Sequence, residues 1–105
     1  MSNNERKREN LKQPPFINKI IHEPARLLII SYLYVLERAD LIFLQNQTQL
    51  TWGNISSHVA KLEEANYVNI EKKFVKKKPQ TLVSLTDEGR KKFEEYRTIM
   101  RQFLN

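Results

Sequence analysis

The stretch LTWGNISSHVAKLEE, residues 50–64, has the pattern of a helix that buries one side. Ile55, Val59 and Leu62 recur at i, i+4 and i+7, which places three apolar side chains in one narrow stripe. Thr51 suits the N-cap position, because its hydroxyl can accept a hydrogen bond from a backbone N–H of the first turn. The opposite face is polar and carries Asn54, Ser57, His58 and Lys61. The stretch therefore predicts a helix that packs by one face and presents the other.

The segment before this stretch predicts further helices. Phe16 to His22 has apolar residues at helical spacing and predicts a short helix. Pro24 suits the first turn of a second helix, which is apolar almost all round and is expected to be buried and to run to about Arg38. Asp40 can cap a third helix that begins at Leu41. This third helix and the stretch above have the proportions of a helix-turn-helix pair.

A hairpin with a basic turn is predicted to follow. Asn66 can take the left-handed conformation that ends the preceding helix. Residues 67–75 alternate as a strand, residues 76–80 (KKKPQ) form the turn, and residues 81–85 return as a second strand. Val68, Ile70 and Phe74 are expected on one side of the first strand, and Val83 and Leu85 are expected to face inward on the second. Thr86 then opens a long final helix over residues 87–104, with acidic residues in its first turn.

The positive charge of the chain is concentrated in the hairpin. Eighteen Lys and Arg against twelve Asp and Glu give a net charge of +6. Residues 67–80 hold five lysines against the single acidic residue Glu71, which gives +4 of this excess. A run of lysines by itself is compatible with a solvated loop, but beside a helix-turn-helix pair it favours contact with phosphate.

Composition excludes several classes of function. The absence of Cys excludes disulfides, thiolate metal sites and thiol redox sensing. The adjacent Ser57 and His58 point about 100° apart on a helix and so make no nucleophile–base pair. Two His without a carboxylate at ligand spacing argue against a metal site, so no cofactor and no enzyme activity are expected. The longest apolar stretch, residues 27–36, is too short to span a membrane, and residues 1–8 lack a secretory pattern, which predicts a cytoplasmic protein.

Five patterns carry a family resemblance. They are Asp40-Leu-x-x-Leu44, Leu50-Thr-x-Gly-Asn-Ile-Ser-x-His-Val-x-Lys-Leu-Glu63, Ala65-x-Tyr-Val68, Lys73-Phe-x-x-Lys-x-Pro-x-Thr81 and Leu85-Thr-x-x-Gly-Arg90. Over residues 16–104 the chain resembles the small MarR/ArsR-like winged-helix transcriptional regulators of archaea and bacteria. It departs from them at Trp52, where a small polar residue is usual, and at Asn66, where Gly is usual.

The resemblance implies a mainly α fold with a small β-hairpin wing, a winged helix-turn-helix with a terminal dimerisation helix. Residues 1–15 are expected to be a disordered basic tail, and residues 16–105 a single domain. The resemblance further implies a homodimer that regulates transcription. It would bind double-stranded DNA at a pseudo-palindromic operator, with residues 51–64 in the major groove and the lysine-rich wing at 75–80 on the adjacent backbone.

The residues expected at the DNA are those of the polar helix face and of the wing. They are Thr51, Trp52, Asn54, Ser56, Ser57, His58, Lys61, Lys73, Lys76, Lys77, Lys78 and Gln80. Asn54 can bond both N6 and N7 of adenine, whereas Ser57 and His58 can bond bases or phosphates. Three positions stay open: Ser56 faces the first helix of the pair or a phosphate, Lys61 contacts phosphate or nothing, and Trp52 packs on the first helix or meets sugars and thymine methyl groups.

An apolar stripe on the terminal helices is expected at the dimer interface. Its members are Phe16, Ile17, Ile20, Phe93, Tyr96, Met100, Phe103 and Leu104. The stripe on the last helix can also close the core of one chain, but it extends beyond what so small a domain would cover. A protein-interaction module without specific DNA binding is the alternative function, and the sequence leaves open whether a small-molecule effector exists.

Overall fold

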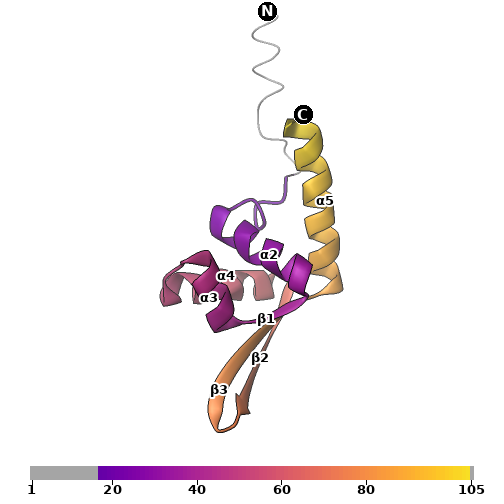
Figure 1. The fold of residues 1–105 in the computed structure, drawn as a ribbon. Helices are drawn as coiled ribbons and strands as arrows, with labels where there is room; N and C mark the ends of the chain where they lie inside the picture. Colours follow the sequence, from indigo (N-terminus) through magenta and orange to yellow (C-terminus); the bar gives the residue numbers. More distant parts are fainter. Residues whose placement is uncertain (1–16, 105) are drawn as a thin grey trace, which may run out of the picture.

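The structure is a computed structural model that describes residues 17–104. The predicted tail at residues 1–15 and the interface residue Phe16 lie outside this range. Among the described residues, no helix combines the length and the apolar character that crossing a membrane would need. The order of elements is helix, short strand, two helices, hairpin and long helix, which confirms the mainly α fold with a β-hairpin wing (Figure 1).

Helix α2 (Pro24–Leu36) begins as the sequence predicts, with Pro24 in its first turn. Glu23 is the N-cap, and its carboxylate accepts from the backbone N–H groups of Ala25 (3.1 Å) and Arg26 (2.8 Å). The helix ends at Leu36, two residues before the predicted end at about Arg38. Glu37 has a φ of 68°, which turns the chain out of the helix, and its N–H bonds the carbonyl of Leu33 at 2.7 Å.

The short helix predicted up to His22 is absent from the described residues, because residues 17–23 form turns. The side chain of Asn18 competes for the backbone here: its Oδ1 accepts from the N–H groups of Ile20 (3.0 Å) and Ile21 (3.1 Å). Its Nδ2 donates to the hydroxyl of Tyr67 at 2.8 Å and so ties this turn to the start of the wing.

Three antiparallel strands form one sheet in the order β1-β3-β2. Strand β1 (Arg38–Asp40), which the sequence analysis did not anticipate, pairs with the base of β3 (Lys78–Leu85) through Ala39 opposite Val83. Strand β2 (Val68–Val75) pairs with the whole of β3, from Val68 opposite Leu85 to Val75 opposite Lys78. The outer part of the hairpin therefore extends beyond β1 and forms the wing.

The wing turn is shorter than predicted. Only Lys76 and Lys77 connect the strands, with φ values of 52° and 66°, and β3 already begins at Lys78 rather than at residue 81. Two consecutive residues with positive φ are the geometry of a two-residue hairpin turn that matches the twist of the strands. Phe74, which was predicted on the same side of the strand as Val68 and Ile70, is 77% exposed because this part of the wing extends past the helices.

The core lies between the helices and the base of the sheet. Its fully buried side chains are Ile21, Ile29, Ile30, Leu33, Leu44, Ile55, Val59, Leu62, Val68 and Val83. Helix α5 (Asp87–Leu104) is preceded by Thr86, whose Oγ1 accepts from the N–H of Gly89 at 2.8 Å. Figure 1 shows α5 and the wing extending in opposite directions from this core.

Candidate nucleic-acid interface

Helices α3 (Leu41–Thr48) and α4 (Trp52–Glu64) form the predicted helix pair. Asp40 caps α3, with its carboxylate accepting from the N–H of Ile42 at 2.8 Å. Gln49 has a φ of 60° and turns the chain, after which the Thr51 hydroxyl accepts from the N–H of Asn54 at 3.2 Å and caps α4. Both predicted caps are therefore confirmed, and the Thr51 side chain is used in holding the start of α4.

Helix α4 packs by one face, as its sequence predicts. Ile55, Val59 and Leu62 are fully buried or nearly so. The opposite face carries the exposed side chains of Asn54, Ser57 and Lys61, which lie one turn apart along the helix. Trp52, at the first position of α4, is 52% exposed. The residues that are free to meet a ligand on α4 thus lie on the face away from the core.

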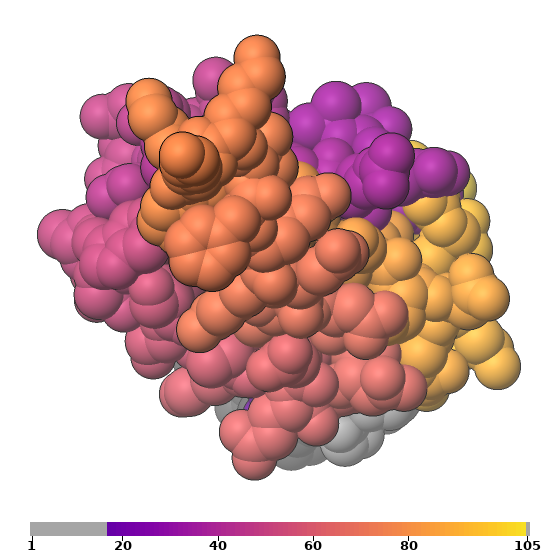
Figure 2. Space-filling model, turned by 90° about the horizontal axis from the view of Figure 1, so that it is seen from below, coloured from indigo at the N-terminus to yellow at the C-terminus, as the bar shows by residue number. Residues whose placement is uncertain are grey.

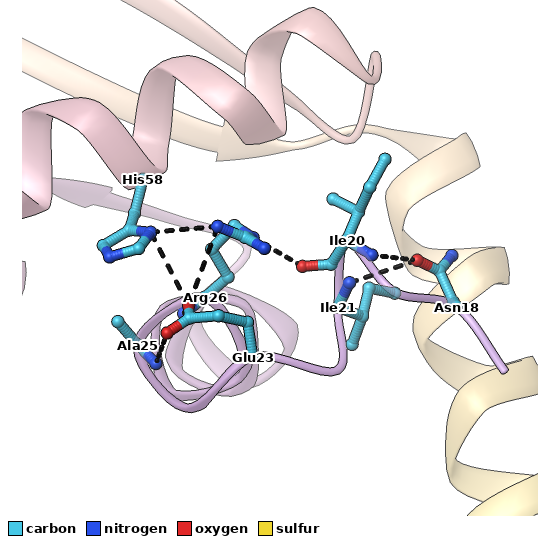
Figure 3. A network of polar contacts seen from close by, with 7 residues as sticks. All are labelled: Asn18, Ile20, Ile21, Glu23, Ala25, Arg26 and His58. Carbon is cyan, nitrogen blue, oxygen red and sulfur yellow. Dashed lines mark hydrogen bonds and ion pairs between the residues drawn. The ribbon is translucent and has the colours of Figure 1, made fainter. Parts of the chain in front are cut away.

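Two of the residues expected at the DNA, Ser56 and His58, are half-buried. The ring of His58 is turned toward α2: its Nδ1 lies 3.1 Å from Nη1 of Arg26 and 3.5 Å from Oε2 of Glu23 (Figure 3). The placement of His58 on the outward face is therefore corrected, because two charged groups at the start of α2 provide partners that sequence alone does not reveal.

The cluster of Glu23, Arg26 and His58 connects α4 to the start of α2. Arg26 also donates from Nε to the carbonyl oxygen of Ile20 at 2.6 Å (Figure 3). Burial alone would raise the pKa of the Glu23 carboxyl. The backbone N–H groups of Arg26 and Ala25, together with the charges of His58 and Arg26, outweigh that effect and hold this pKa below its ordinary value. The cluster therefore favours an ionised Glu23.

The wing presents a cationic surface. All five of its lysines are exposed, namely Lys72, Lys73, Lys76, Lys77 and Lys78. Gln80, which the sequence analysis placed at the DNA, is half-buried and donates from Nε2 to Oδ2 of Asp40 at 3.0 Å. It links the base of the wing to the cap of α3, so its amide nitrogen has a partner within the fold.

A small cleft separates the wing from the start of the helix pair. It has a volume of about 190 Å³ and is lined by Asp40, Leu41, Ile42, Trp52, Pro79 and Thr81. Seen from the tip of the wing, the orange hairpin stands toward the viewer with the helix pair beside it in pink (Figure 2). Trp52 thus lies across a cleft from the wing, a location that sequence reasoning did not foresee.

The residues predicted at the dimer interface divide into two groups. Ile17, Phe93 and Tyr96 are each only 6% exposed and belong to the core of the single chain. The Tyr96 hydroxyl lies 2.8 Å from Nδ1 of His22, and burial raises the pKa of Tyr96. The remaining described residues of the stripe are more accessible: Ile20 and Leu104 are exposed, whereas Met100 and Phe103 are half-buried.

Two features of the interface were missed at the sequence level. Arg26 belongs to an apolar helix pattern, and nothing local indicates that it reaches His58 on another helix. Phe74 fits the alternation of a buried strand, so its exposure depends on where the core ends rather than on its neighbours in sequence. The five lysines around it are the local signal from which contact of the hairpin with phosphate was predicted.

The helix pair with a hairpin wing directly after it defines a winged-helix protein. The sequence matches the family described as "Winged helix DNA-binding domain" over residues 25–104, and the chain belongs to this family. An uncharacterized protein of Methanocaldococcus jannaschii is 35% identical over 78 residues, which are 74% of this chain and 85% of the relative.

Solved structures of regulators have the same fold. The transcriptional regulator homologue protein from Pyrococcus horikoshii OT3 is 27% identical and superimposes with a TM-score of 0.78, covering 95% of this chain and 94% of that one. NadR in complex with 4-hydroxyphenylacetate is 25% identical with a TM-score of 0.68, covering 90% of this chain and 67% of that one. The resemblance to winged-helix regulators is thereby confirmed.

Proposed function

We propose that this chain is a homodimeric transcriptional regulator that binds specific sequences in double-stranded DNA. The observation that carries the proposal is that α4, which has an exposed polar face, begins across a cleft from a wing with five exposed lysines. An α-helix fits the major groove of B-DNA, and a cationic hairpin beside it reaches the adjacent phosphates. Membership of the family and the likeness to the regulator homologue support the same function.

The two parts of the surface have different tasks in this proposal. Asn54, Ser57 and Lys61 on α4 face the base edges and the flanking phosphates. Asn54 is suited to read adenine, because its amide can donate to N7 and accept from N6 at once. The wing lysines contact phosphates, which adds affinity for any sequence and positions α4 without reading bases.

Dimerisation is part of the proposal because one helix reads too few base pairs to select an operator. Two copies related by a two-fold axis would present two α4 helices to a pseudo-palindrome, about one turn of DNA apart. The exposed end of α5, with Leu104 74% exposed beside the half-buried Phe103, is the surface we assign to this contact. Ile17, Phe93 and Tyr96 support it only indirectly, since they hold α5 on the core.

Salt dependence of DNA binding tests the proposal. We expect the full chain to bind a duplex selected from a random pool. Replacing Lys76, Lys77 and Lys78 with Gln should lower the slope of log K against log salt by ~2.7, at ~0.9 for each lost phosphate contact. A matched control replaces three exposed cations away from the wing, Lys19, Lys91 and Arg101, with Gln.

The control variant carries the same change of net charge and should keep most of the wild-type slope. Equal slopes for the two variants would mean that overall charge, not the wing, governs binding. If the full chain selects no duplex even at micromolar concentration and low salt, the proposal of specific DNA binding is wrong. A protein-interaction module then becomes the better interpretation.

We also propose that a small molecule can act as an effector, which the NadR complex with 4-hydroxyphenylacetate supports by likeness. An open apolar groove between α2 and α3 has a volume of about 430 Å³ and could hold such a molecule. It is lined by Leu28, Ser31, Tyr32, Val35, Leu36 and Phe43. Thermal unfolding with and without 4-hydroxyphenylacetate tests this ligand, since a molecule that binds only the folded state raises the transition temperature. An unchanged transition at millimolar concentration would exclude it.

A further inference from the structure

Phe74 is the most exposed aromatic side chain in the described part of the chain. It lies on β2 two residues before the wing turn and is 77% exposed. Its cross-strand partner is Pro79, which is also exposed. A large exposed apolar side chain surrounded by polar groups is typical of a contact surface. We therefore expect the tip of the wing to bind a partner.

The register of the hairpin defines the direction of Phe74. Side chains alternate along a strand, so Phe74 shares its side of β2 with Ile70 and Val68, which face the core. Pro79, directly opposite Phe74, lines the cleft with Trp52 at the start of α4. Phe74 therefore belongs to the side of the wing that faces the helix pair.

The charge around Phe74 identifies the chemistry of its partner. Lys72 and Lys73 precede it on β2, and three more lysines follow within four residues. A partner must therefore be polyanionic and must also have an apolar surface that the side chain of Phe74 can reach. Double-stranded DNA has both properties, because its phosphates flank the minor groove and the apolar faces of its stacked bases become accessible when a side chain enters between two base steps.

We propose that Phe74 is an apolar wedge that the wing inserts into the minor groove next to the major-groove site of α4. The proposal rests on the proposed function, since it assumes that α4 binds DNA. Apolar side chains that enter the minor groove separate neighbouring base pairs and bend the duplex toward the major groove. Here the bend would be directed toward α4, and the lysines beside Phe74 would hold the two backbones.

Pro79 and the tight turn give the wedge a rigid support. The ring of Pro79 has a fixed φ and lies opposite Phe74, while only Lys76 and Lys77 close the hairpin. A short hairpin in which the residues before and after Phe74 both pair with β3 loses little freedom on binding, which lowers the entropic cost of insertion.

The test compares Phe74→Ala and Phe74→Leu in the full chain. The probe is a duplex selected by the wild-type protein from a random pool, labelled at its two ends for energy transfer and carrying 2-aminopurine next to the wing. Phe74→Ala should bind roughly tenfold more weakly, because removing one aromatic contact to a base costs about that factor. It should also lose the wild-type shortening of the end-to-end distance and the rise in 2-aminopurine fluorescence.

The salt slope separates the wedge from the lysines. Phe74→Ala removes no charge and should keep the wild-type slope, and Phe74→Leu should retain most of the bend because leucine also serves as a wedge. Asn69→Ala, which changes an exposed, uncharged residue on the other side of the same strand, is the control and should bind as wild type does. Thermal unfolding of each variant verifies that the fold is intact.

Each outcome has a defined meaning. A bent duplex with wild-type protein and a straight one with Phe74→Ala supports the wedge. Wild-type affinity and bending in Phe74→Ala would overturn it while leaving the proposed function in place. If the wild-type protein selects no duplex, the proposed function itself fails. Binding to vesicles of phosphatidylglycerol and phosphatidylcholine that exceeds binding to DNA, and that Phe74→Ala abolishes, would instead assign the wing to an anionic membrane.

Discussion

The two glycines of the chain make a matched pair of tests for the packing of the fold. Gly53 and Gly89 each lie in the first turn of a helix, α4 and α5 respectively. A Cβ atom on Gly53 would meet nothing within 4 Å, whereas a Cβ on Gly89 would collide with the carbonyl oxygen of Tyr67 and lie 2.9 Å from Cδ1 of Leu85. The same substitution should therefore have opposite effects at the two sites.

The Tyr67 carbonyl cannot yield easily. Its oxygen accepts from the N–H of Thr86 at 3.0 Å, and the Thr86 hydroxyl donates to the carbonyl of Asn66 at 2.7 Å. Overpacking of this kind costs ~1–3 kcal/mol, and the upper end applies where backbone must move. Alanine regains up to ~1 kcal/mol of helix propensity at either position. Gly89→Ala should thus lower the free energy of unfolding by ~2 kcal/mol, and Gly53→Ala should raise it by up to ~1 kcal/mol.

Urea denaturation at a fixed protein concentration measures both changes in the free energy of unfolding. In thermal melts, the Tm of Gly89→Ala should lie roughly 8–16 °C below that of the wild type. The fixed concentration matters because the stability of a dimer depends on it. Gly89→Ala with a stability equal to or above that of Gly53→Ala would refute the reasoning, since helix propensity alone would then account for both. It would also mean that the first turn of α5 does not pack tightly against the backbone of Tyr67, the residue before β2.

Three further predictions concern the interface, the acid range and assembly. Asn54→Ala should cost ~1–3 kcal/mol on the selected duplex and little on random DNA, measured by fluorescence anisotropy, whereas equal losses would assign Asn54 to the backbone. The pKa of Glu23 is lowered in the fold, so its stabilising effect is present above its ordinary pKa and is lost as the pH falls through the folded value. Urea titrations across the acid range should therefore show the stability difference between wild type and Glu23→Gln shrinking on acidification, and a constant difference would contradict this. Replacing both Phe103 and Leu104 with Asp should give a monomer in sedimentation equilibrium, whereas Val35→Asp should stay dimeric; the reverse result would move the interface to α2.

The sequence was most informative where local chemistry determines local structure. Thr51 and Asp40 cap their helices as predicted, because a short oxygen-bearing side chain satisfies the first backbone N–H groups wherever a helix begins. Asn66 has the expected positive φ of 65°. The stripe of α4 is buried as its spacing indicates. In each case the relevant partner is within a few residues, so no knowledge of the fold is needed.

Prediction failed where the partner is distant in sequence. Strand β1 has only three residues, and it exists because Ala39 meets Val83 across forty-odd positions. His58 looks like its polar neighbours on α4, and only the packing of α2 against α4 gives it Glu23 and Arg26 as partners. The wing turn lacks the Asn-Gly signature of a two-residue turn, so its length could not be read from two lysines.

The wing shows how one pattern yields both correct and incorrect expectations. Alternation correctly assigned Val68, Ile70 and Phe74 to one side of β2, yet the first is 1% exposed and the last 77% exposed. What changes along the strand is the presence of helices beneath it, since α4 covers the base of the sheet and the wing extends past it. An apolar residue beyond the end of the core has the same sequence signal as a core residue but is available for a partner. Phe74 is such a residue, and because five lysines surround it, the partner it indicates is polyanionic.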